Sequence, residues 1–130
     1  TIGDNIANVD EDVAGLDLFA SYTIGQTTLL FEHVTALDDF KAGEIGAVAS
    51  QPSATHIELD YNLSDNQTVA ISLNTSNEAG GIPDVYKKTA TIAYSSIFYE
   101  NISYALETLS TKGYDGSSDN IITVQIAIEF

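Results

Sequence analysis

The chain places an imidazole and two carboxylates at alternate positions, His56, Glu58 and Asp60. Alternate side chains of an extended strand project from one face, so these three groups would lie side by side. An imidazole beside carboxylates can transfer protons or bind a metal ion. The same spacing also occurs in the polar wall of a sheet, and the sequence offers no further ligand at a fixed spacing. We therefore expect a polar wall here and predict no catalytic residue.

Carboxylates are also concentrated in glycine-bearing polar segments that are typical of loops. Carboxylate oxygens suit Ca²⁺, although none of these segments carries a complete calcium-loop pattern. The candidate ligands of such a calcium site are Asp10, Asp12, Asp38, Asp39, Asp115 and Asp119. Solvated acidic loops are the simpler interpretation and the one we favour. No serine has a partnered histidine and no glycine run forms a phosphate-binding motif, so we expect no enzyme and no cofactor beyond this calcium.

Composition narrows the range of partners. The 130 residues include 19 acidic and four basic side chains, which gives a formal net charge of −15. Binding to phosphates needs clustered lysine or arginine, so nucleic acid is not expected as a partner. Cysteine is absent from the sequence, which excludes disulfide bonds and thiolate metal sites. The chain begins at Thr1 without an apolar leader, so we expect a processed piece of a longer protein.

Strands are the elements that must position these groups. Apolar and polar residues alternate with a period of two, whereas the spacing of an amphipathic helix is not sustained. The clearest run alternates Ile57 and Leu59 with His56 and Glu58. Seven strands are predicted, at residues 16–24, 28–34, 54–63, 68–74, 89–95, 101–107 and 122–130.

The predicted connections between these strands alternate in length. Short turns that suit antiparallel hairpins are expected at 25–26, 64–66 and 97–99. Longer polar loops are expected at 35–52, 76–85 and 110–119. Short turns at one end and long loops at the other are typical of outer-membrane barrels. The predicted fold class is therefore all-β, an antiparallel up-and-down meander of about seven strands that forms part of a transmembrane β-barrel.

The two faces of the strands are expected to meet different environments. One face is aliphatic with aromatic residues toward the strand ends, as the lipid-facing band of a barrel requires. Its aromatic residues are Tyr22, Phe31, Tyr61, Tyr94, Tyr104 and Phe130. The other face is polar and acidic, which suits a water-filled lumen. The residues predicted to face the lumen are Asp17, Glu32, His56, Glu58, Asp60, Glu107 and Glu129.

Several runs of the chain carry a family resemblance. Ile126, Ile128 and Phe130 alternate up to the end, which resembles the C-terminal signature strand of Gram-negative outer-membrane β-barrels. That resemblance implies that these three residues form the signal recognised by the barrel-assembly machinery. The runs 15–22, 30–40, 52–54 and 119–130 resemble the C-terminal part of the LbtU-type siderophore porin family. The likeness departs from the family pattern at His33 and at Thr108.

The resemblance implies a place and a function for the chain. Residues 15–130 would be the C-terminal portion of a larger barrel in the lipid of the bacterial outer membrane, and residues 1–14 an acidic N-terminal segment or extracellular loop. Open edges are costly in lipid, so the partners would be missing N-terminal barrel strands or further copies of the chain. The implied function is a porin-like channel wall for passive uptake of small polar solutes, including iron–siderophore complexes. The alternative is a secreted structural β-protein that assembles through its edge strands into an oligomer or fibre.

Overall fold

Seven β-strands make up the fold. The computed structural model describes residues 12–82, 84–99 and 102–128. The strands are β1 (Gly15–Ile24), β2 (Thr27–Ala36), β3 (Ser53–Ser64), β4 (Gln67–Asn77), β5 (Lys88–Tyr99), β6 (Ile102–Lys112) and β7 (Ser118–Ile128). Within these described ranges, no helix is long and apolar enough to cross a membrane.

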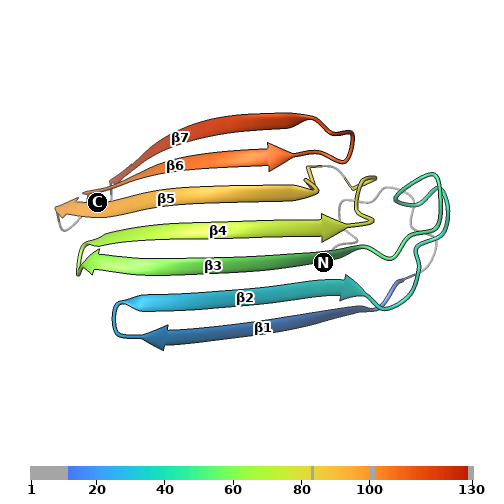
Figure 1. The fold of residues 1–130 in the computed structure, drawn as a ribbon, viewed down its shortest axis with the longest axis horizontal. Helices are drawn as coiled ribbons and strands as arrows, with labels where there is room; N and C mark the ends of the chain where they lie inside the picture. The colour runs from blue at the N-terminus through green and yellow to red at the C-terminus, as the bar shows by residue number, and fades with distance from the viewer. Residues whose placement is uncertain (1–11, 83, 100–101, 129–130) are drawn as a thin grey trace.

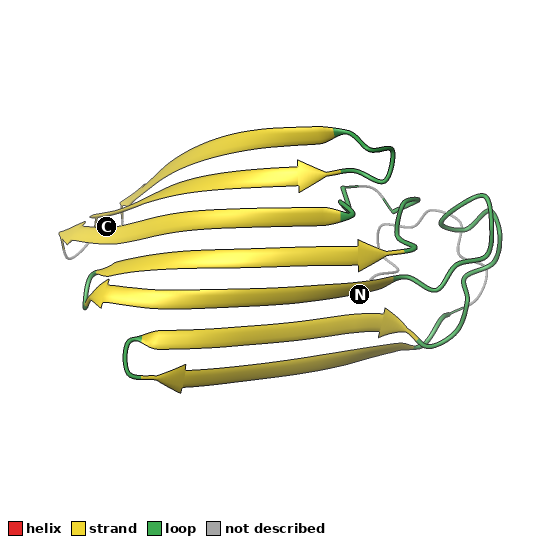
Figure 2. Cartoon of the chain, viewed as in Figure 1, coloured by secondary structure: helices red, strands yellow, loops and turns green. Residues whose placement is uncertain are grey.

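The strands form one antiparallel sheet in sequence order, with β1 at one edge and β7 at the other. Figures 1 and 2 show the resulting meander, with its hairpin turns at one end and its larger loops at the opposite end. The predicted all-β meander of seven antiparallel strands is confirmed. The sheet is open, because the pairing in the described residues ends at β1 and β7.

The register brings like residues together across the sheet. Ile71 of β4 lies opposite Leu59 of β3 and also opposite Ile92 of β5. We call the face that carries these residues the apolar face. The opposite face carries His56 of β3 and Asn74 of β4, which also lie directly opposite each other, and we call it the polar face. Because side chains alternate along each strand, a single register places apolar residues side by side on one face and polar residues side by side on the other.

The apolar face is more exposed than the polar face. In a water-soluble sheet with one packed face, the apolar face would be the buried one. On the apolar face, Ile92 is 57% exposed and Ile122 is 72% exposed. On the polar face, Ser72 is 6% exposed, and His56 and Glu58 are half-buried. A sheet that curls toward its polar face crowds that face and opens the other. The apolar face therefore stands outward with nothing packed on it in the described part of the chain.

Two predicted connections are wrong. The turn expected at 97–99 is strand, because β5 pairs with β6 through an irregularity between Ile97 and Tyr99 and continues until Tyr99 lies opposite Ile102. The long loop expected at 110–119 is a short turn at 113–117, because β6 extends to Lys112 and β7 begins at Ser118. Asp115 closes this turn by accepting hydrogen bonds at Oδ1 from the backbone N–H and the hydroxyl of Ser117, at 2.9 and 2.6 Å.

The buried apolar side chains lie at the loop end of the sheet. Phe40 and Ile45 of the β2–β3 loop are 7% and 4% exposed and pack with Ala36, the last residue of β2. Within the loop, Phe40 and Ser50 pair as an isolated β-bridge. The predicted long loop at 35–52 is thus a folded element that begins after β2 has ended at Ala36.

Candidate functional site

The polar face collects most of the carboxylates that the strands carry. Glu32 of β2 lies opposite His56 of β3, and Glu107 of β6 lies opposite Ala93 of β5. The residues predicted to face a lumen that occupy polar-face positions are Asp17, Glu32, His56, Glu58, Asp60 and Glu107. Glu129, the remaining one, lies outside the described residues. The register therefore brings six of the predicted residues to one face.

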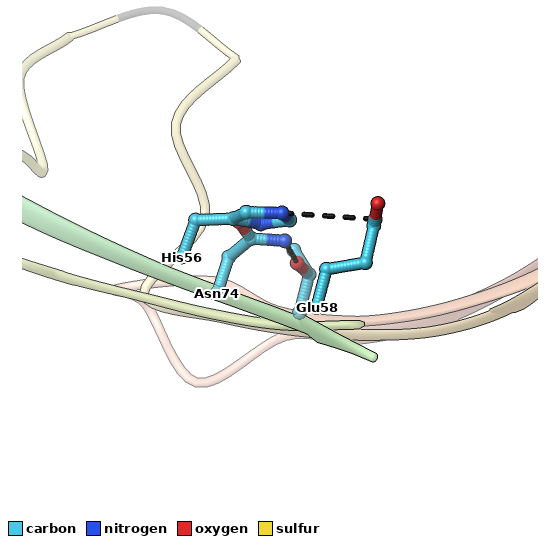
Figure 3. A network of polar contacts seen from close by, with 4 residues as sticks. His56, Glu58 and Asn74 are labelled. Atoms are coloured by element: carbon cyan, nitrogen blue, oxygen red, sulfur yellow. Dashed lines mark hydrogen bonds and ion pairs between the residues drawn. The ribbon is translucent and has the colours of Figure 1, made fainter. Parts of the chain in front are cut away.

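A polar ladder crosses the three middle strands of this face, toward its loop end. His56 Nδ1 of β3 lies 2.6 Å from Asn74 Oδ1 of β4, and Asn74 Nδ2 donates to Thr89 Oγ1 of β5 at 2.8 Å. His56 Nε2 lies 3.6 Å from Glu58 Oε2, at the distance of an ion pair. Figure 3 shows His56, Glu58 and Asn74 projecting from the same side of the sheet.

The amide of Asn74 sets the orientation of the imidazole. Its nitrogen donates to Thr89, so its oxygen faces His56 and accepts a hydrogen bond from Nδ1–H. The other ring nitrogen then faces the carboxylate of Glu58. The ladder ends at the Thr89 hydroxyl, and Ser72 lies directly opposite Glu58 on the same face. The ladder is suited to holding three strands in register and to presenting charge to water.

Sequence reasoning missed Asn74 and Thr89 as members of this site. Both belong to predicted strands, but the β3–β4 hairpin turn separates Asn74 from His56, and the β4–β5 loop separates Thr89 from Asn74. Aligning the three strands about these two connections would place Asn74 and Thr89 in one row with His56, as the register does. The sequence carries the information that would align these three residues, but that information lies in the register between strands and not in any single run of residues.

The polar face has a negative charge. Its carboxylates lie on β1, β2, β3, β6 and β7, and none of the described strand positions on this face carries a lysine. Lys88 and Lys112 lie opposite each other on the apolar face at its loop end. The face is not uniformly polar, since it also carries Phe19, Leu30, Val34, Leu109 and Ile121. Cations in water beside this face would be attracted and anions repelled.

A shallow hollow lies near the hairpin end of the sheet. It has a volume of about 290 Å³ and is lined mainly by hydroxyl and amide side chains of β4 to β7 and their turns. Its polar lining includes Asn66, Thr68, Ser95, Ser103 and Gln125. The lining contains one charged residue, Asp65. This part of the surface can form hydrogen bonds to a neutral polar solute, and no sequence motif marks it.

The carboxylates predicted as calcium ligands belong to different elements of the fold. Asp12, Asp38 and Asp39 are exposed, Asp115 is engaged in its own turn, and Asp119 belongs to β7 rather than to a loop. Asp10 lies outside the described residues. Among the residues that the structure describes, no group of three or more histidine, aspartate and glutamate side chains could hold a metal ion. The predicted calcium thus has no assembled site in this part of the chain.

The described residues of the predicted assembly signal and aromatic band lie on the apolar face. Ile126 and Ile128 of β7 lie opposite Tyr104 and Ile102 of β6, whereas Phe130 lies outside the described residues. The hairpin end of the face carries Tyr22, Tyr61, Tyr94 and Tyr104. Tyr94 and Tyr104 have ring centroids 5.8 Å apart. Phe31, opposite Ile57, lies near the middle of β2 and not with this group.

The chain matches no family model, no curated protein and no solved structure.

Proposed function

We propose that the sheet is part of the wall of a β-barrel channel in a bacterial outer membrane. Its polar face would line a water-filled lumen, and its apolar face would contact lipid. The exposed apolar face supports this proposal more than any other observation. Ile122, Val124 and Ile126 of β7 are 72%, 70% and 69% exposed, and exposed apolar surface of this extent indicates an interaction with lipid or protein.

The charge distribution on the apolar face suits lipid. Charged residues of the described strands on this face are the two lysines at its loop end, Lys88 and Lys112, and carboxylates are absent from it. Lysine at the edge of a lipid-facing band can extend its amine toward the headgroups. Tyrosine at the opposite, hairpin end is likewise typical of a membrane–water interface.

Strand length also suits a bilayer. The strands contain 10 to 12 residues. At about 3.3 Å per residue and a tilt near 45°, such strands rise about 23–28 Å along the membrane normal. The apolar band of outer-membrane barrels is about 25 Å tall.

Closure of the barrel follows from the direction of the edge strands. In an antiparallel meander of seven strands, β1 and β7 run in the same direction. A ring made of copies alone would place β7 of one copy beside β1 of the next in parallel pairing. Antiparallel pairing at both edges requires an odd number of further strands between β7 and β1. We therefore favour further strands, such as the expected N-terminal ones, over a ring of copies.

The chemistry of the polar face points to the class of solute. Glu32, Glu58, Asp60 and Glu107 would attract cations and repel anions in the lumen, and hydroxyl and amide groups would hydrogen-bond to neutral polar solutes. The channel would thus pass small polar solutes, with cations favoured over anions, by diffusion. The resemblance to siderophore porins adds iron–siderophore complexes as candidate solutes.

Reconstitution in a planar bilayer tests the proposal. The membrane-assembled protein should give discrete conductance steps, and a potassium chloride gradient should give a reversal potential of the sign expected for cation selectivity. Partition into detergent and heat-modifiable migration on a gel should accompany the conductance. A detergent-independent assembly that conducts no ions would overturn the proposal and favour the alternative of a structural fibre built through the edge strands.

A further inference from the structure

The loops at the end of the sheet opposite the hairpins pack against one another. Phe40 and Ile45 of the β2–β3 loop pack against Ala36. Val13, before β1, and Ile82, in the β4–β5 loop, pack against the same residues. We call these five residues the loop cluster. It joins three segments that are far apart in sequence.

Tyr114 joins a further segment, the β6–β7 turn, to the β4–β5 loop. Ser76 Oγ donates to Tyr86 O at 2.7 Å, so the Tyr114 hydroxyl donates to Ser76 Oγ, 2.6 Å away. The same hydroxyl accepts a hydrogen bond from Ala79 N at 3.2 Å. The ring of Tyr114 lies against Gly80, where a β-carbon would be 3.1 Å from it. Tyr114 is therefore a positioning residue for the β4–β5 loop.

The β2–β3 and β4–β5 loops are also interlocked by a hydrogen bond and by a close backbone approach. Gln51 N donates to Glu78 Oε2 at 2.8 Å. Gly81 passes so close to the carbonyl of Ile45 that a β-carbon at position 81 would overlap it. Because the obstructing atoms belong to the backbone, only glycine fits there without a shift of one loop.

This packing lies on the polar side of the sheet. Ala36 and Thr111 occupy polar-face positions at the loop end and are 5% and 3% exposed. Leu16 and Leu18 occupy apolar-face positions at the same end and are 53% and 58% exposed. Figure 3 shows the pale yellow β4–β5 connection rising on the side from which His56 and its neighbours project. The loops therefore cover polar-face positions such as Ala36 at this end and leave the apolar face open.

We propose that the interlocked loops form a fixed constriction over one mouth of the channel and set its size limit. The inference rests on the proposed function, since it assumes that the polar face lines a lumen. A constriction held by a buried cluster and by hydrogen bonds between loops does not have to move when a solute passes. The size limit is then set by the loops and not by the sheet-lined section, which favours small hydrated solutes as cargo.

Single-channel recording with polymers of graded size tests the size limit. Tyr114→Phe removes the hydroxyl that joins Ser76 and Ala79 but keeps the ring. We expect it to admit larger uncharged polyethylene glycols and to raise the conductance. Tyr86→Phe is the matched control, because the Tyr86 hydroxyl makes no hydrogen bond within the described residues. An unchanged polymer limit in Tyr114→Phe, with conductance intact, would overturn the constriction and leave the channel proposal standing.

Thiol accessibility provides a second measurement that needs no conductance. The chain has no cysteine, so Ala36→Cys and Ala54→Cys each report one site. Both are polar-face positions, but Ala36 is buried under the loops and Ala54 is exposed. A hydrophilic maleimide should label Ala36→Cys far more slowly, and adding Tyr114→Phe should speed that labelling roughly tenfold, as expected for lost hydrogen bonds. Equal labelling of the two sites would show that the loops do not cover the face. If the protein does not conduct ions but Ala36→Cys is still labelled slowly, the channel proposal would be overturned, whereas the covering of Ala36 by the loops would stand.

Discussion

Gly81 of the β4–β5 loop lies directly against the carbonyl oxygen of Ile45 in the β2–β3 loop, with no room for a side chain between them. The contact joins two loops that are separated by two complete strands, β3 and β4. It is one of the places where the fold requires a particular residue at the loop end.

Gly81→Ala should destabilise the folded protein by about 1–3 kcal/mol, the usual cost of forcing an added group into a packed site. The loops would have to separate, because the new methyl group meets backbone atoms. Gly46→Ala is the matched control, since a β-carbon there would lie 3.8 Å from the nearest atom, Val48 O. Denaturant unfolding of the detergent-solubilised protein measures the free energy of unfolding of both variants. Equal free energies of unfolding for the two variants would contradict the interlocked loops.

Ile122→Arg and Thr123→Arg should differ strongly in membrane assembly. The two positions are adjacent in β7 and both are exposed, but Ile122 lies on the apolar face and Thr123 on the polar face. An arginine facing lipid near the midplane costs about 2–4 kcal/mol, whereas an arginine facing the lumen costs little. Urea unfolding in lipid vesicles gives the two free energies. A protein in water would tolerate both substitutions alike, so similar values would contradict the lipid-facing assignment.

Glu58→Gln and Asp60→Asn should each reduce cation selectivity. A unit charge acting over about 4 Å of water is worth about 1 kcal/mol, so each change should lower the cation-to-anion permeability ratio by at most about fivefold. The effect should shrink as salt rises, because ions screen the remaining carboxylates. Ala93→Ser, on the same face, is the charge-neutral control. Reversal potentials at two salt concentrations measure the ratio, and an unaltered ratio in both carboxylate variants would remove these residues from the ion path.

Asp115 should make the β6–β7 turn sensitive to acid. The hydrogen bond from the Ser117 hydroxyl, followed by the one from the Ser117 backbone N–H, lowers the pKa of Asp115 from its ordinary value of 3.8. A lowered folded pKa means that the carboxylate stabilises the turn above pH 3.8 and that this stabilisation is lost as the pH falls through the lower, folded value.

Nuclear magnetic resonance titration of the Asp115 carboxyl carbon measures this pKa. Ser117→Ala removes the first of the two hydrogen bonds and should raise the pKa of Asp115 toward 3.8. In the parent protein, protection of the Ser117 amide from hydrogen exchange should be lost as the pH falls through the lowered, folded pKa of Asp115. An Asp115 pKa that is the same in the parent protein and in Ser117→Ala would show that the hydroxyl does not stabilise the charged form.

The strands were predictable because each is a local pattern. Ile57, Leu59 and their polar neighbours alternate without interruption, and Gly25 supplies the turn after β1 with a φ of 59°. The same reasoning failed at residues 97–99, where aromatic residues continue the strand past an irregularity. It also failed at Asp119, because the tight turn closed by Asp115 returns the chain to a strand earlier than the polar composition suggests.

The polar ladder was predictable only in part. His56 and Glu58 share a face by their spacing alone, and the sequence is sufficient to place them together. Their partner Asn74 is set by the β3–β4 register, and a shift of one residue would turn it to the other face. The candidate calcium ligands were chosen by composition, and composition alone does not place carboxylates side by side.

The sequence by itself determined seven strands, their antiparallel order and the division of their side chains between an apolar and a polar face. Period-two alternation and local turn chemistry suffice for these features because they involve neighbours along the chain. Only the tertiary structure decided which face is crowded, and that the loops fold onto the polar side through Ala36 and Tyr114. Those features depend on the curl of the whole sheet and on contacts such as that of Gly81 with Ile45, between residues that the sequence keeps far apart.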